Sequence, residues 1–346
     1  MLMTTASCAA IIPWEVSDMA DNTLIRTEDL CVWFPVRRAL PFGKRHYVKA
    51  VDNVSITIEK GETFGLVGES GCGKSTLASA LLGMQKPTGG KVYFKGKDLN
   101  TLNDKEFKEA RRDMQMIFQD PFSSLDPRWD VYRLISEPMY IRGGYTKEEM
   151  EKEVLRLLKL VGLNEDDLHR YPSEFSGGQR QRIGIARAIS LHPDFLVCDE
   201  PVSALDVSVH AQILNLLMEL QQEMNMTYLF ISHNLAVVKD ICKNLCVMYL
   251  GQVMETGDTQ EIFHNPLHPY TRSLLSAVLS VNLDEKRERM VLNGDIPIPI
   301  EAPKGCRFCT RCPYATEKCH QETPQLQPCG DKHWIACHFP GIGMDR

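Results

Sequence analysis

The stretch "GLVGESGCGKST", residues 65–76, has the spacing G-x-x-x-x-G-K-[ST] from Gly68 to Ser75. An apolar run that predicts a buried strand precedes it, and residues 75–84 have helical periodicity. In such a loop the backbone N–H groups wrap phosphates, the lysine reaches the outer phosphates and the serine hydroxyl binds magnesium. We therefore predict a nucleoside triphosphate site formed by Gly68, Ser70, Gly71, Cys72, Gly73, Lys74, Ser75 and Thr76.

A second apolar run, "FLVCDEP" at residues 195–201, ends in two acids, Asp199 and Glu200. A carboxylate at the end of a strand can hold magnesium through water, and the next carboxylate is placed to activate an attacking water. On its own such a segment could be a surface turn. Together with the phosphate loop it predicts hydrolysis of the triphosphate.

A second glycine turn precedes an amphipathic helix in "FSGGQRQRIGIARAI", residues 175–189. Ser176, Gly177 and Gly178 stand at the amino end of that helix, where exposed N–H groups can bind phosphate oxygens. One phosphate site does not need two such loops. We therefore expect the second loop to serve the nucleotide of another subunit, in a head-to-tail pair with ATP between the chains.

Length and composition limit the class of protein. A chain of 346 residues is long enough for two or three compact units. Its formal charge of -6 gives no general attraction to nucleic acid or anionic lipid. No apolar run approaches the roughly 18 to 20 residues that span a bilayer, so we expect any membrane role to depend on a partner.

Strand and helix patterns alternate along the chain. Residues 194–201, 227–233 and 245–257 predict strands, and residues 208–225 predict a helix between two of them. Alternation at this spacing predicts an α/β fold with a mainly parallel sheet covered on both faces. Residues 265–281 predict a turn and a helix, and the prolines of 295–305 predict an extended connector.

On these motifs the sequence resembles the ABC ATPase family. Residues 175–179 resemble its signature motif, with Phe175 in place of the usual leucine. The resemblance implies that Gln119 contacts the magnesium or the attacking water, that His233 positions the γ-phosphate and that Tyr47 stacks on adenine. The pair contacts it implies are made by Ser176, Gly177, Gly178, Gln179 and Asp206.

The resemblance also implies an architecture. We expect a P-loop NTPase core of the RecA-like kind over residues 25–260, with an antiparallel β subdomain and a helical subdomain over about 120–180. Residues 1–24 are expected to be a disordered leader, and 261–346 a carboxyl-terminal extension with a cysteine-rich module. Catalysis is assigned to Glu200, His233 and Gln119, and magnesium to Ser75, Gln119 and Asp199.

Sequence segments outside the ATPase motifs resemble segments of the ATPases of dipeptide and oligopeptide importers. The resemblance is strongest to the second of the two paired ATPase subunits of those importers. The segments are "QDPFSSLDPR" at 119–128, "HNPLHPYTRSLLSAV" at 264–278 and the cysteine block. The implied partners are a homologous ATPase subunit, two permease subunits and, indirectly, an extracellular or periplasmic solute-binding protein, with no nucleic acid. The implied location is the cytoplasmic face of the cell membrane, with peripheral attachment.

Two other functions stay open on the sequence. The ATPases of nickel importers share much of these sequence segments, so the sequence does not determine the imported solute. Soluble ABC ATPases that act on nucleic acid or ribosomes usually carry two cassettes or a long coiled coil. This chain has one phosphate loop and no such heptad run, which favours transport.

The segment after Gln119 is expected to form part of a groove for a short permease helix. Phe122, Leu125 and Trp129 are the apolar side chains that could contact it. The equal alternative is that some of them pack inside the domain.

Six cysteines crowd into residues 306–337. Cys306, Cys309 and Cys312 give C-x2-C-x2-C followed by a proline, a run typical of iron-sulfur ligands. Zinc held by thiolates and unligated reduced thiols are the alternatives. The peptide-importer resemblance implies the ligands of a [4Fe-4S] cluster, or of zinc, as Cys306, Cys312, Cys319 and Cys337.

Overall fold

The computed structural model describes residues 22–36, 46–276, 300 and 302–344. The chain divides into two compact units. The first contains Met1–Thr57, Leu66–Asn100 and Leu235–Arg346, and the second contains Ile58–Gly65 and Thr101–Asn234. The chain passes between the units within β3 (Thr57–Glu59) and β4 (Thr63–Val67), and again after Asn100 and after Asn234.

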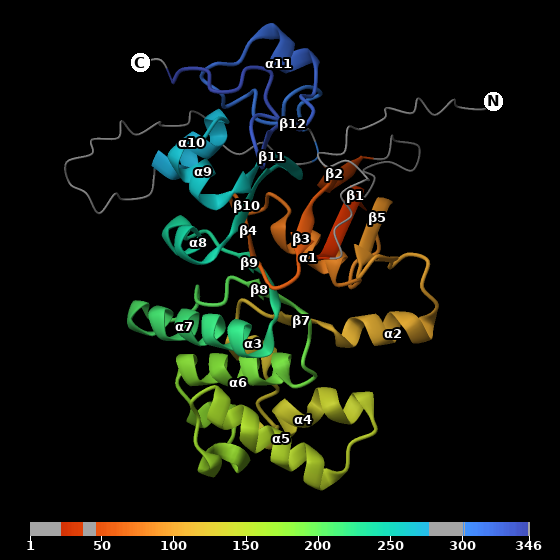
Figure 1. The fold of residues 1–346 in the computed structure, drawn as a ribbon, viewed down its shortest axis with the longest axis vertical. Helices are drawn as coiled ribbons and strands as arrows, with labels where there is room; N and C mark the ends of the chain where they lie inside the picture. Colours follow the sequence, from red (N-terminus) through yellow and green to blue (C-terminus); the bar gives the residue numbers. More distant parts are fainter. Residues whose placement is uncertain (1–21, 37–45, 277–299, 301, 345–346) are drawn as a thin grey trace. The chain divides into compact units, whose positions relative to one another are not determined.

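The first unit is built mainly from antiparallel strands. One sheet has the order β2-β1-β5-β6, and in another part of the unit β10, β11, β13 and β12 pair in that order. Its elements are β1 (Thr23–Pro35), β2 (Tyr47–Val54), α1 (Lys74–Leu81), β5 (Gly89–Phe94), β6 (Lys97–Asp98), α8 (Leu235–Ile241), β10 (Asn244–Tyr249), β11 (Gln252–Asp258), α9 (Thr259–His264), α10 (Pro269–Ser276), α11 (Glu317–Gln321), β12 (Gln327–Pro328) and β13 (His333–Ile335). The antiparallel sheet that the resemblance implied is therefore present (Figure 1).

Residues 245–257 are not one strand, as the sequence predicted, but a hairpin of β10 and β11. At the turn Leu250 has φ 42° and Gly251 has φ 81°. Two consecutive residues with positive φ form the tight turn that matches the twist of antiparallel strands. The turn was missed because leucine is not a usual residue for this conformation.

The second unit contains a parallel sheet and a group of helices. Its elements are α2 (Asp104–Arg112), β7 (Met114–Ile117), α3 (Pro121–Ser124), α4 (Val131–Arg142), α5 (Lys147–Leu160), η2 (Glu165–His169), η3 (Pro172–Glu174), α6 (Gly177–Ile189), β8 (Phe195–Asp199), α7 (Val207–Met224) and β9 (Thr227–Ile231). Strand β8 pairs in parallel with β7 on one side and β9 on the other. The prediction of a parallel sheet holds for these three strands and is wrong for β10 to β13.

Local sequence signals explain where these elements begin and end. All five residues of β8 and all five of β9 are buried, as expected for the middle of a parallel sheet. Helix α5 begins with a capping box between Thr146 and Glu149, and α7 ends where Asn225 takes the left-handed conformation at φ 50°. For α5 and α7, the hydrophobic periodicity and the capping residues thus both indicate the helices that the structure shows.

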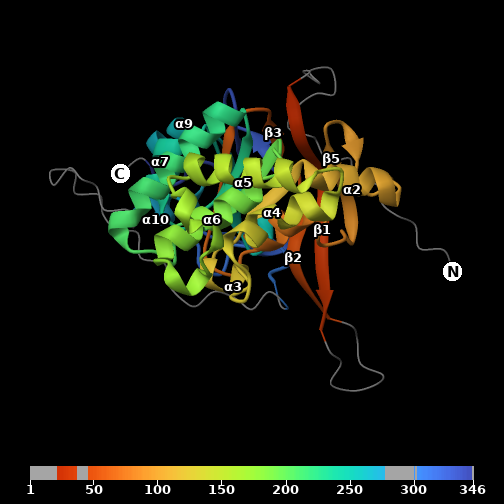
Figure 2. The ribbon, with the colours of Figure 1, turned by 90° about the horizontal axis from the view of Figure 1, so that it is seen from below.

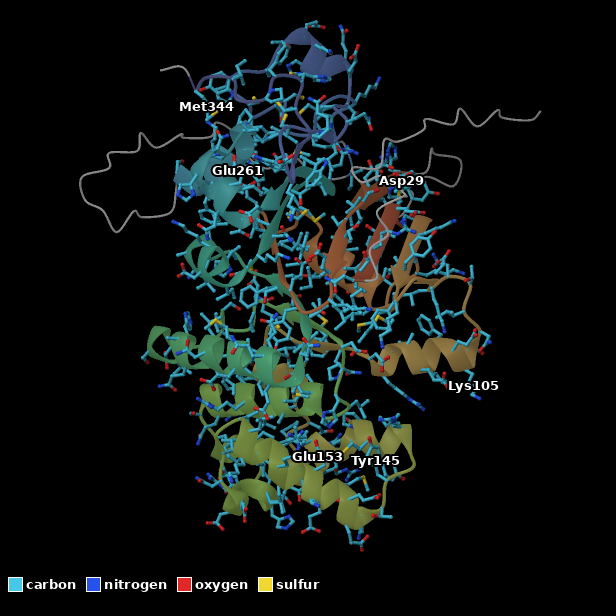
Figure 3. The ribbon with its side chains drawn as sticks, viewed as in Figure 1. Asp29, Lys105, Tyr145, Glu153, Glu261 and Met344 are labelled. Atoms are coloured by element: carbon cyan, nitrogen blue, oxygen red, sulfur yellow. The ribbon has the colours of Figure 1, made fainter. Side chains whose placement is uncertain are left out.

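Helices α4, α5 and α6 pack against one another, and Figures 1 and 2 both show them side by side. Polar contacts complement this packing on the outer faces. Glu153 of α5, labelled in Figure 3, accepts a hydrogen bond from Arg156 Nη2 at 2.7 Å and lies 3.2 Å from His192 Nε2. Helices α4 and α5 lie within the segment predicted as the helical subdomain, about 120–180, whereas α6 begins near its end and continues to Ile189. The limits of that subdomain remain a prediction.

Some predictions fall on residues that the structure does not describe. Most of the leader, 1–21, the end of the helix predicted at 265–281 and most of the connector 295–305 lie outside the described residues. Strand β1 begins at Thr23, inside the predicted leader. Among the described helices, none combines the length and apolar character needed to cross a membrane.

Candidate functional site: phosphate loop, carboxyl edge and cysteine cavity

The phosphate loop lies in the first unit and leads directly into α1. Lys74 is buried, and its ammonium donates to the carbonyl oxygens of Gly68 at 2.7 Å and Glu69 at 3.1 Å. Ser70, Gly71 and Ser75 are exposed, and the Cys72 side chain is buried. The lysine is therefore bonded to the loop's own carbonyl groups, and the middle of the loop, at Ser70 and Gly71, is open to solvent.

Two glycines of this loop are required by close backbone approach. A Cβ at Gly68, which has φ 152°, would lie 2.2 Å from the carbonyl oxygen of Met248, and one at Gly73, with φ 108°, would lie 2.0 Å from that of Ala50. No L side chain fits at such distances. The hairpin of β10 and β11 contacts the phosphate loop directly, because Gly251 N, at its turn, donates to the carbonyl oxygen of Cys72 at 2.9 Å.

Tyr47, the predicted adenine-stacking residue, begins β2 with 38% of its surface exposed. Its ring centroid is 6.4 Å from that of Trp33, with the rings tilted by 54°. The Trp33 indole N–H donates to Asp52 Oδ1 at 3.1 Å, and the Lys49 ammonium lies 4.4 Å from the Trp33 ring centroid. The Tyr47 ring is therefore exposed enough to stack on a base, while Trp33 lies beside it at an angle.

The predicted catalytic side chains meet in the second unit, at the carboxyl edge of β7, β8 and β9. Gln119 is two residues beyond β7, Glu200 follows β8 directly and His233 is two residues beyond β9. Gln119 Nε2 donates to Glu200 Oε2 at 2.8 Å, and His233 Nδ1 lies 3.4 Å from the same oxygen. Parallel strands end at one edge of a sheet, which is why three distant segments converge here.

The backbone holds Glu200 in an unusual conformation. Its φ is 47°, in the left-handed region that non-glycine residues seldom adopt. Its N–H donates to the Ile231 carbonyl at 3.0 Å, and its carbonyl accepts from the Ser203 hydroxyl at 3.0 Å. Asp199 ends β8 and is 7% exposed. A left-handed residue fixed on both sides aims one carboxylate away from the strand end, where it meets Gln119 and His233.

The signature turn forms the amino end of α6, as predicted. Ser176 is the N-cap, and a capping box joins it to Gln179, with Ser176 N donating to Gln179 Oε1 at 3.0 Å. Phe175 is 4% exposed, and the Arg170 guanidinium lies 4.4 Å from its ring centroid. Gly178 also has a packing role that sequence reasoning missed, because a Cβ there would lie 2.6 Å from Val209 Cγ1. Asp206 is exposed as the N-cap of α7.

The three side chains proposed for a permease groove have different environments. Phe122 is 54% exposed, and the Arg180 guanidinium covers its ring at 4.4 Å. Trp129 is half-buried, with the Arg133 guanidinium 4.1 Å from its ring centroid. Leu125 is 3% exposed. Leu125 is therefore core packing, and Phe122 is the side chain available for contact.

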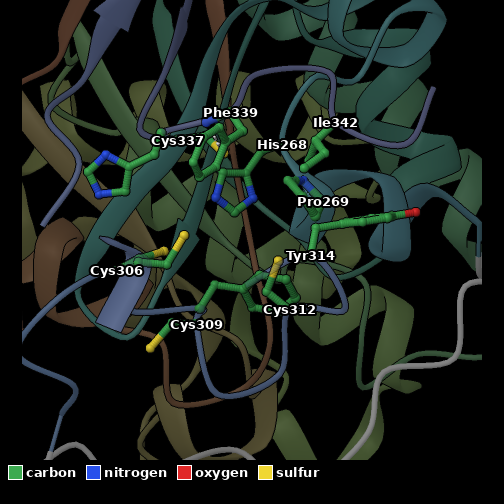
Figure 4. Close-up of a pocket in the computed structure, with 12 residues that line it drawn as sticks. His268, Pro269, Cys306, Cys309, Cys312, Tyr314, Cys337, Phe339 and Ile342 are labelled. Atoms are coloured by element: carbon green, nitrogen blue, oxygen red, sulfur yellow. Dashed lines mark hydrogen bonds between the residues drawn. The ribbon is translucent and has the colours of Figure 1, made fainter. Parts of the chain in front are cut away.

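Five of the cysteines line one cavity in the carboxyl-terminal extension (Figure 4). They are the four predicted ligands, Cys306, Cys312, Cys319 and Cys337, and the additional Cys309. Cys329 does not line the cavity. The rest of the lining is formed by His268, Pro269, Phe308, Tyr314, His338, Phe339 and Ile342. The four predicted ligands thus line one cavity together with Cys309, and their role as ligands remains a prediction.

Burial raises the pKa of four of these thiols, those of Cys306, Cys309, Cys312 and Cys337. It raises the pKa of Cys306 to about 12 and that of Cys312 to about 11, and neighbouring thiols add to both shifts. Backbone N–H groups counter the shifts by donating to sulfur, and Phe339 N reaches Cys337 Sγ at 3.4 Å. In the described part of the chain, no three histidine, cysteine or carboxylate side chains are arranged to hold one metal ion.

Two known protein families match separate parts of the chain. The family described as "ABC transporter" matches residues 51–203, and the one described as "Oligopeptide/dipeptide transporter, C-terminal region" matches 254–319.

Curated relatives match almost the whole chain. The oligopeptide transport ATP-binding protein AppF of Bacillus subtilis (strain 168) is 49% identical, covering 92% of this chain and 98% of that protein. The dipeptide transport ATP-binding protein DppF of Haemophilus influenzae is 47% identical, covering 93% of this chain and 98% of that protein.

Solved structures match the cassette part. The post-hydrolysis dimer of the ATP-binding cassette MJ0796, bound to ADP and Pi, is 29% identical at a TM-score of 0.60, covering 68% of this chain and 99% of that one. The structure of cbiO1 from Clostridium perfringens is 28% identical at the same TM-score, covering 70% and 91%. Motifs, fold and relatives agree, and the chain belongs to the ABC transporter family of ATPases, among the ATP-binding proteins of oligopeptide and dipeptide transporters.

Proposed function

We propose that this chain is the ATP-hydrolysing subunit of a membrane importer for dipeptides or oligopeptides, attached to the cytoplasmic face of the cell membrane. The observation that carries the proposal is the convergence of Gln119 and His233 on one carboxylate oxygen of Glu200. That arrangement is suited to holding and deprotonating a water. The names of the relatives, all at 47% identity or more, support peptides as the solute.

In the proposed reaction each group has one task. Lys74 leaves the carbonyl groups of its own loop and binds the outer phosphates, and the loop amides bind the others. The family resemblance assigns magnesium to Ser75, Asp199 and Gln119, which would hold it, and the ion would neutralise phosphate charge. Glu200 takes a proton from water through its carboxylate, and His233 donates to the γ-phosphate.

The signature turn is proposed to act on the nucleotide of a second, homologous ATPase subunit, which we expect to be a different chain. Ser176 and the N–H groups of Gly177, Gly178 and Gln179 are proposed to bind that γ-phosphate, with Asp206 at the seam. The dimeric cassette structure among the relatives, described as bound to ADP and Pi, supports pairing of this kind. Closing and reopening of the pair would switch two permease subunits between their states, and a solute-binding protein would deliver the peptide.

Glu200→Gln tests hydrolysis. Because Gln cannot accept the proton but keeps the shape of the side chain, we expect Mg-ATP binding to persist while turnover falls roughly a hundredfold or more. Turnover at the wild-type rate would remove Glu200 from the proposed role. Uptake of labelled peptides and of nickel by cells with and without the gene then assigns the solute, and nickel uptake alone would replace peptides in the proposal.

For the cysteine cavity we propose a [4Fe-4S] cluster held by Cys306, Cys312, Cys319 and Cys337. Four thiols stand around a hollow with apolar walls, and backbone N–H groups donate to three of the sulfurs. Both features suit a thiolate-bound cluster. Cys309 lines the same cavity (Figure 4), and it is left out of the set because the family resemblance does not include it.

The cluster is tested on protein purified without oxygen. We expect broad absorption near ~400 nm, four iron atoms per chain being the stoichiometry of such a cluster. Cys312→Ser should lose this absorption, and Cys329→Ser, outside the cavity, is the matched control that should keep it. Colourless protein with one zinc per chain would overturn the assignment.

A further inference from the structure

Two arginines alternate with the cysteines in "CRFCTRC", residues 306–312. The cysteines line the cavity, whereas Arg307 and Arg311 reach carboxylates on the elements that precede and form the phosphate loop. Phe308, fully buried between them, packs against Tyr249 and Tyr270 with centroid distances of 5.4 and 5.3 Å. All of these residues belong to the first unit. The segment therefore has one face toward the cavity and another toward the nucleotide-binding elements.

Arg311 makes a two-pronged ion pair with Glu69, the residue directly after Gly68. Its two terminal nitrogens donate to Glu69 Oε2 at 2.7 Å and to Oε1 at 3.1 Å. The side chains are 9% and 23% exposed, respectively, so the pair is largely shielded from water. Paired, hydrogen-bonded geometry of this kind is the strong form of an arginine-carboxylate contact.

The same residue is fixed a second time through its backbone. Glu69 N donates to the Tyr270 hydroxyl at 2.9 Å, and the Tyr249 hydroxyl accepts from Arg311 at 3.3 Å. Lys74 in turn donates to the Glu69 carbonyl. Side chain, N–H and carbonyl of Glu69 are all engaged, and two of these contacts come from the carboxyl-terminal extension.

Arg307 makes a parallel contact on β2. It donates to Asp52 Oδ2, and Asp52 also accepts from Trp33 Nε1 and Lys49 Nζ. Asp52 is 7% exposed. Two arginines of one short segment thus bind two carboxylates. Arg307 binds Asp52, which accepts from the Trp33 indole, and Arg311 binds Glu69 in the phosphate loop.

We propose that Arg311 compensates the charge of Glu69 in the phosphate loop: the pairing neutralises a carboxylate that would otherwise repel the triphosphate. Arg307 pairs with Asp52 in the same way, so two residues of the cysteine-rich segment neutralise carboxylates on the nucleotide-binding elements and thereby raise the affinity for ATP. The proposal rests on the proposed nucleotide role of residues 68–76.

The test is a charge cycle in the full-length chain, with Mg-ATP affinity measured by titration. Arg311→Ala should weaken binding about tenfold, the order expected when one unpaired carboxylate faces the phosphates in a partly screened site. Glu69→Gln should bind at least as tightly as wild type. The double variant R311A/E69Q should recover to within about threefold, since the unpaired charge is gone. Arg311→Lys keeps the charge but loses the two-pronged geometry, so its affinity should lie between those of wild type and Arg311→Ala.

Arg272→Ala is the matched control. Arg272 also lies in the extension, but it donates to backbone carbonyls of Ile342 and Gly343 and not to a carboxylate of the loop. It should loosen the extension and leave ATP affinity within about twofold. If Arg311→Ala does not fold, Glu69→Gln and Arg311→Lys still decide the outcome.

Three results would overturn the proposal: wild-type affinity in Arg311→Ala, no recovery in the double variant, or weaker binding in Glu69→Gln. A wild-type chain that binds no Mg-ATP at all would instead remove the proposed nucleotide role.

Discussion

A methyl group added at Gly178 should separate the packing role of the signature turn from its chemistry. In Gly178→Ala the new Cβ would lie 2.6 Å from Val209 Cγ1 and 3.8 Å from that residue's Cβ and Cγ2. Carbon atoms pack best at about 3.5 to 4.0 Å, so one contact is short by roughly 1 Å. Val209 is β-branched on helix α7, where one rotamer is strongly preferred, so it cannot easily turn away.

The expected free energies follow from two opposing effects. Overpacking of this kind costs about 1 to 3 kcal/mol of unfolding free energy. Replacing a helical glycine by alanine returns up to about 1 kcal/mol. Gly178→Ala should therefore destabilise the chain by up to about 2 kcal/mol. In a Val209→Ala background the clash is gone, and the same change should be neutral or stabilising.

The assay is urea unfolding of the four chains of this double-mutant cycle. ATP turnover should follow stability and recover in the double variant, because the methyl points toward α7 and leaves the N–H groups of the turn in place. An equal effect of Gly178→Ala in both backgrounds would refute the packing argument. Recovered stability without recovered turnover would show that the methyl disturbs the chemistry itself.

Two further predictions concern pH and the segment after Gln119. Burial lowers the pKa of His268 to about 4, so the folded chain excludes a proton that the unfolded chain binds below about pH 6.5. The stability that depends on neutral His268 should therefore be fully present above that pH. It should fall by up to about 3 kcal/mol as the pH is lowered toward 4. His268→Asn should flatten this fall in unfolding measured against pH, and an unchanged slope would contradict the assignment. Leu125→Ala should cost about 2 to 5 kcal/mol in urea unfolding, as expected for a buried leucine. Phe122→Ala should cost less than about 1 kcal/mol while weakening permease co-purification, and the reverse ranking would exchange their roles.

The catalytic edge was predictable because it follows from strand order and short motifs. Glu200 directly follows a buried apolar strand, and His233 stands two residues beyond another, so parallel pairing of these strands brings them together. Gln119 needed the family resemblance, since nothing local distinguishes it from a solvated glutamine. The left-handed φ of Glu200 gave no sequence signal, because it is imposed by contacts with Ile231 and Ser203.

The contacts of the carboxyl-terminal extension were not predictable from the sequence. Glu69 and Arg311 are 242 positions apart, and no periodicity links them. The regular spacing of arginines between cysteines was the available signal. It shows that the two residue types face different neighbours, but not which carboxylates those neighbours carry. The close approach of Gly178 to Val209 was hidden for a similar reason, since the signature motif already explained the glycine.

The central claim is that the turn at 176–178 binds a phosphate held by a second ATPase chain. The most direct measurement is a structure of the complete transporter complex, carrying Glu200→Gln and trapped with Mg-ATP. We predict that the Ser176 hydroxyl and the N–H groups of the turn lie within about 3.2 Å of γ-phosphate oxygens of the nucleotide on the partner's phosphate loop. A trapped, ATP-loaded complex in which the turn faces solvent, or contacts only its own chain, would contradict the account.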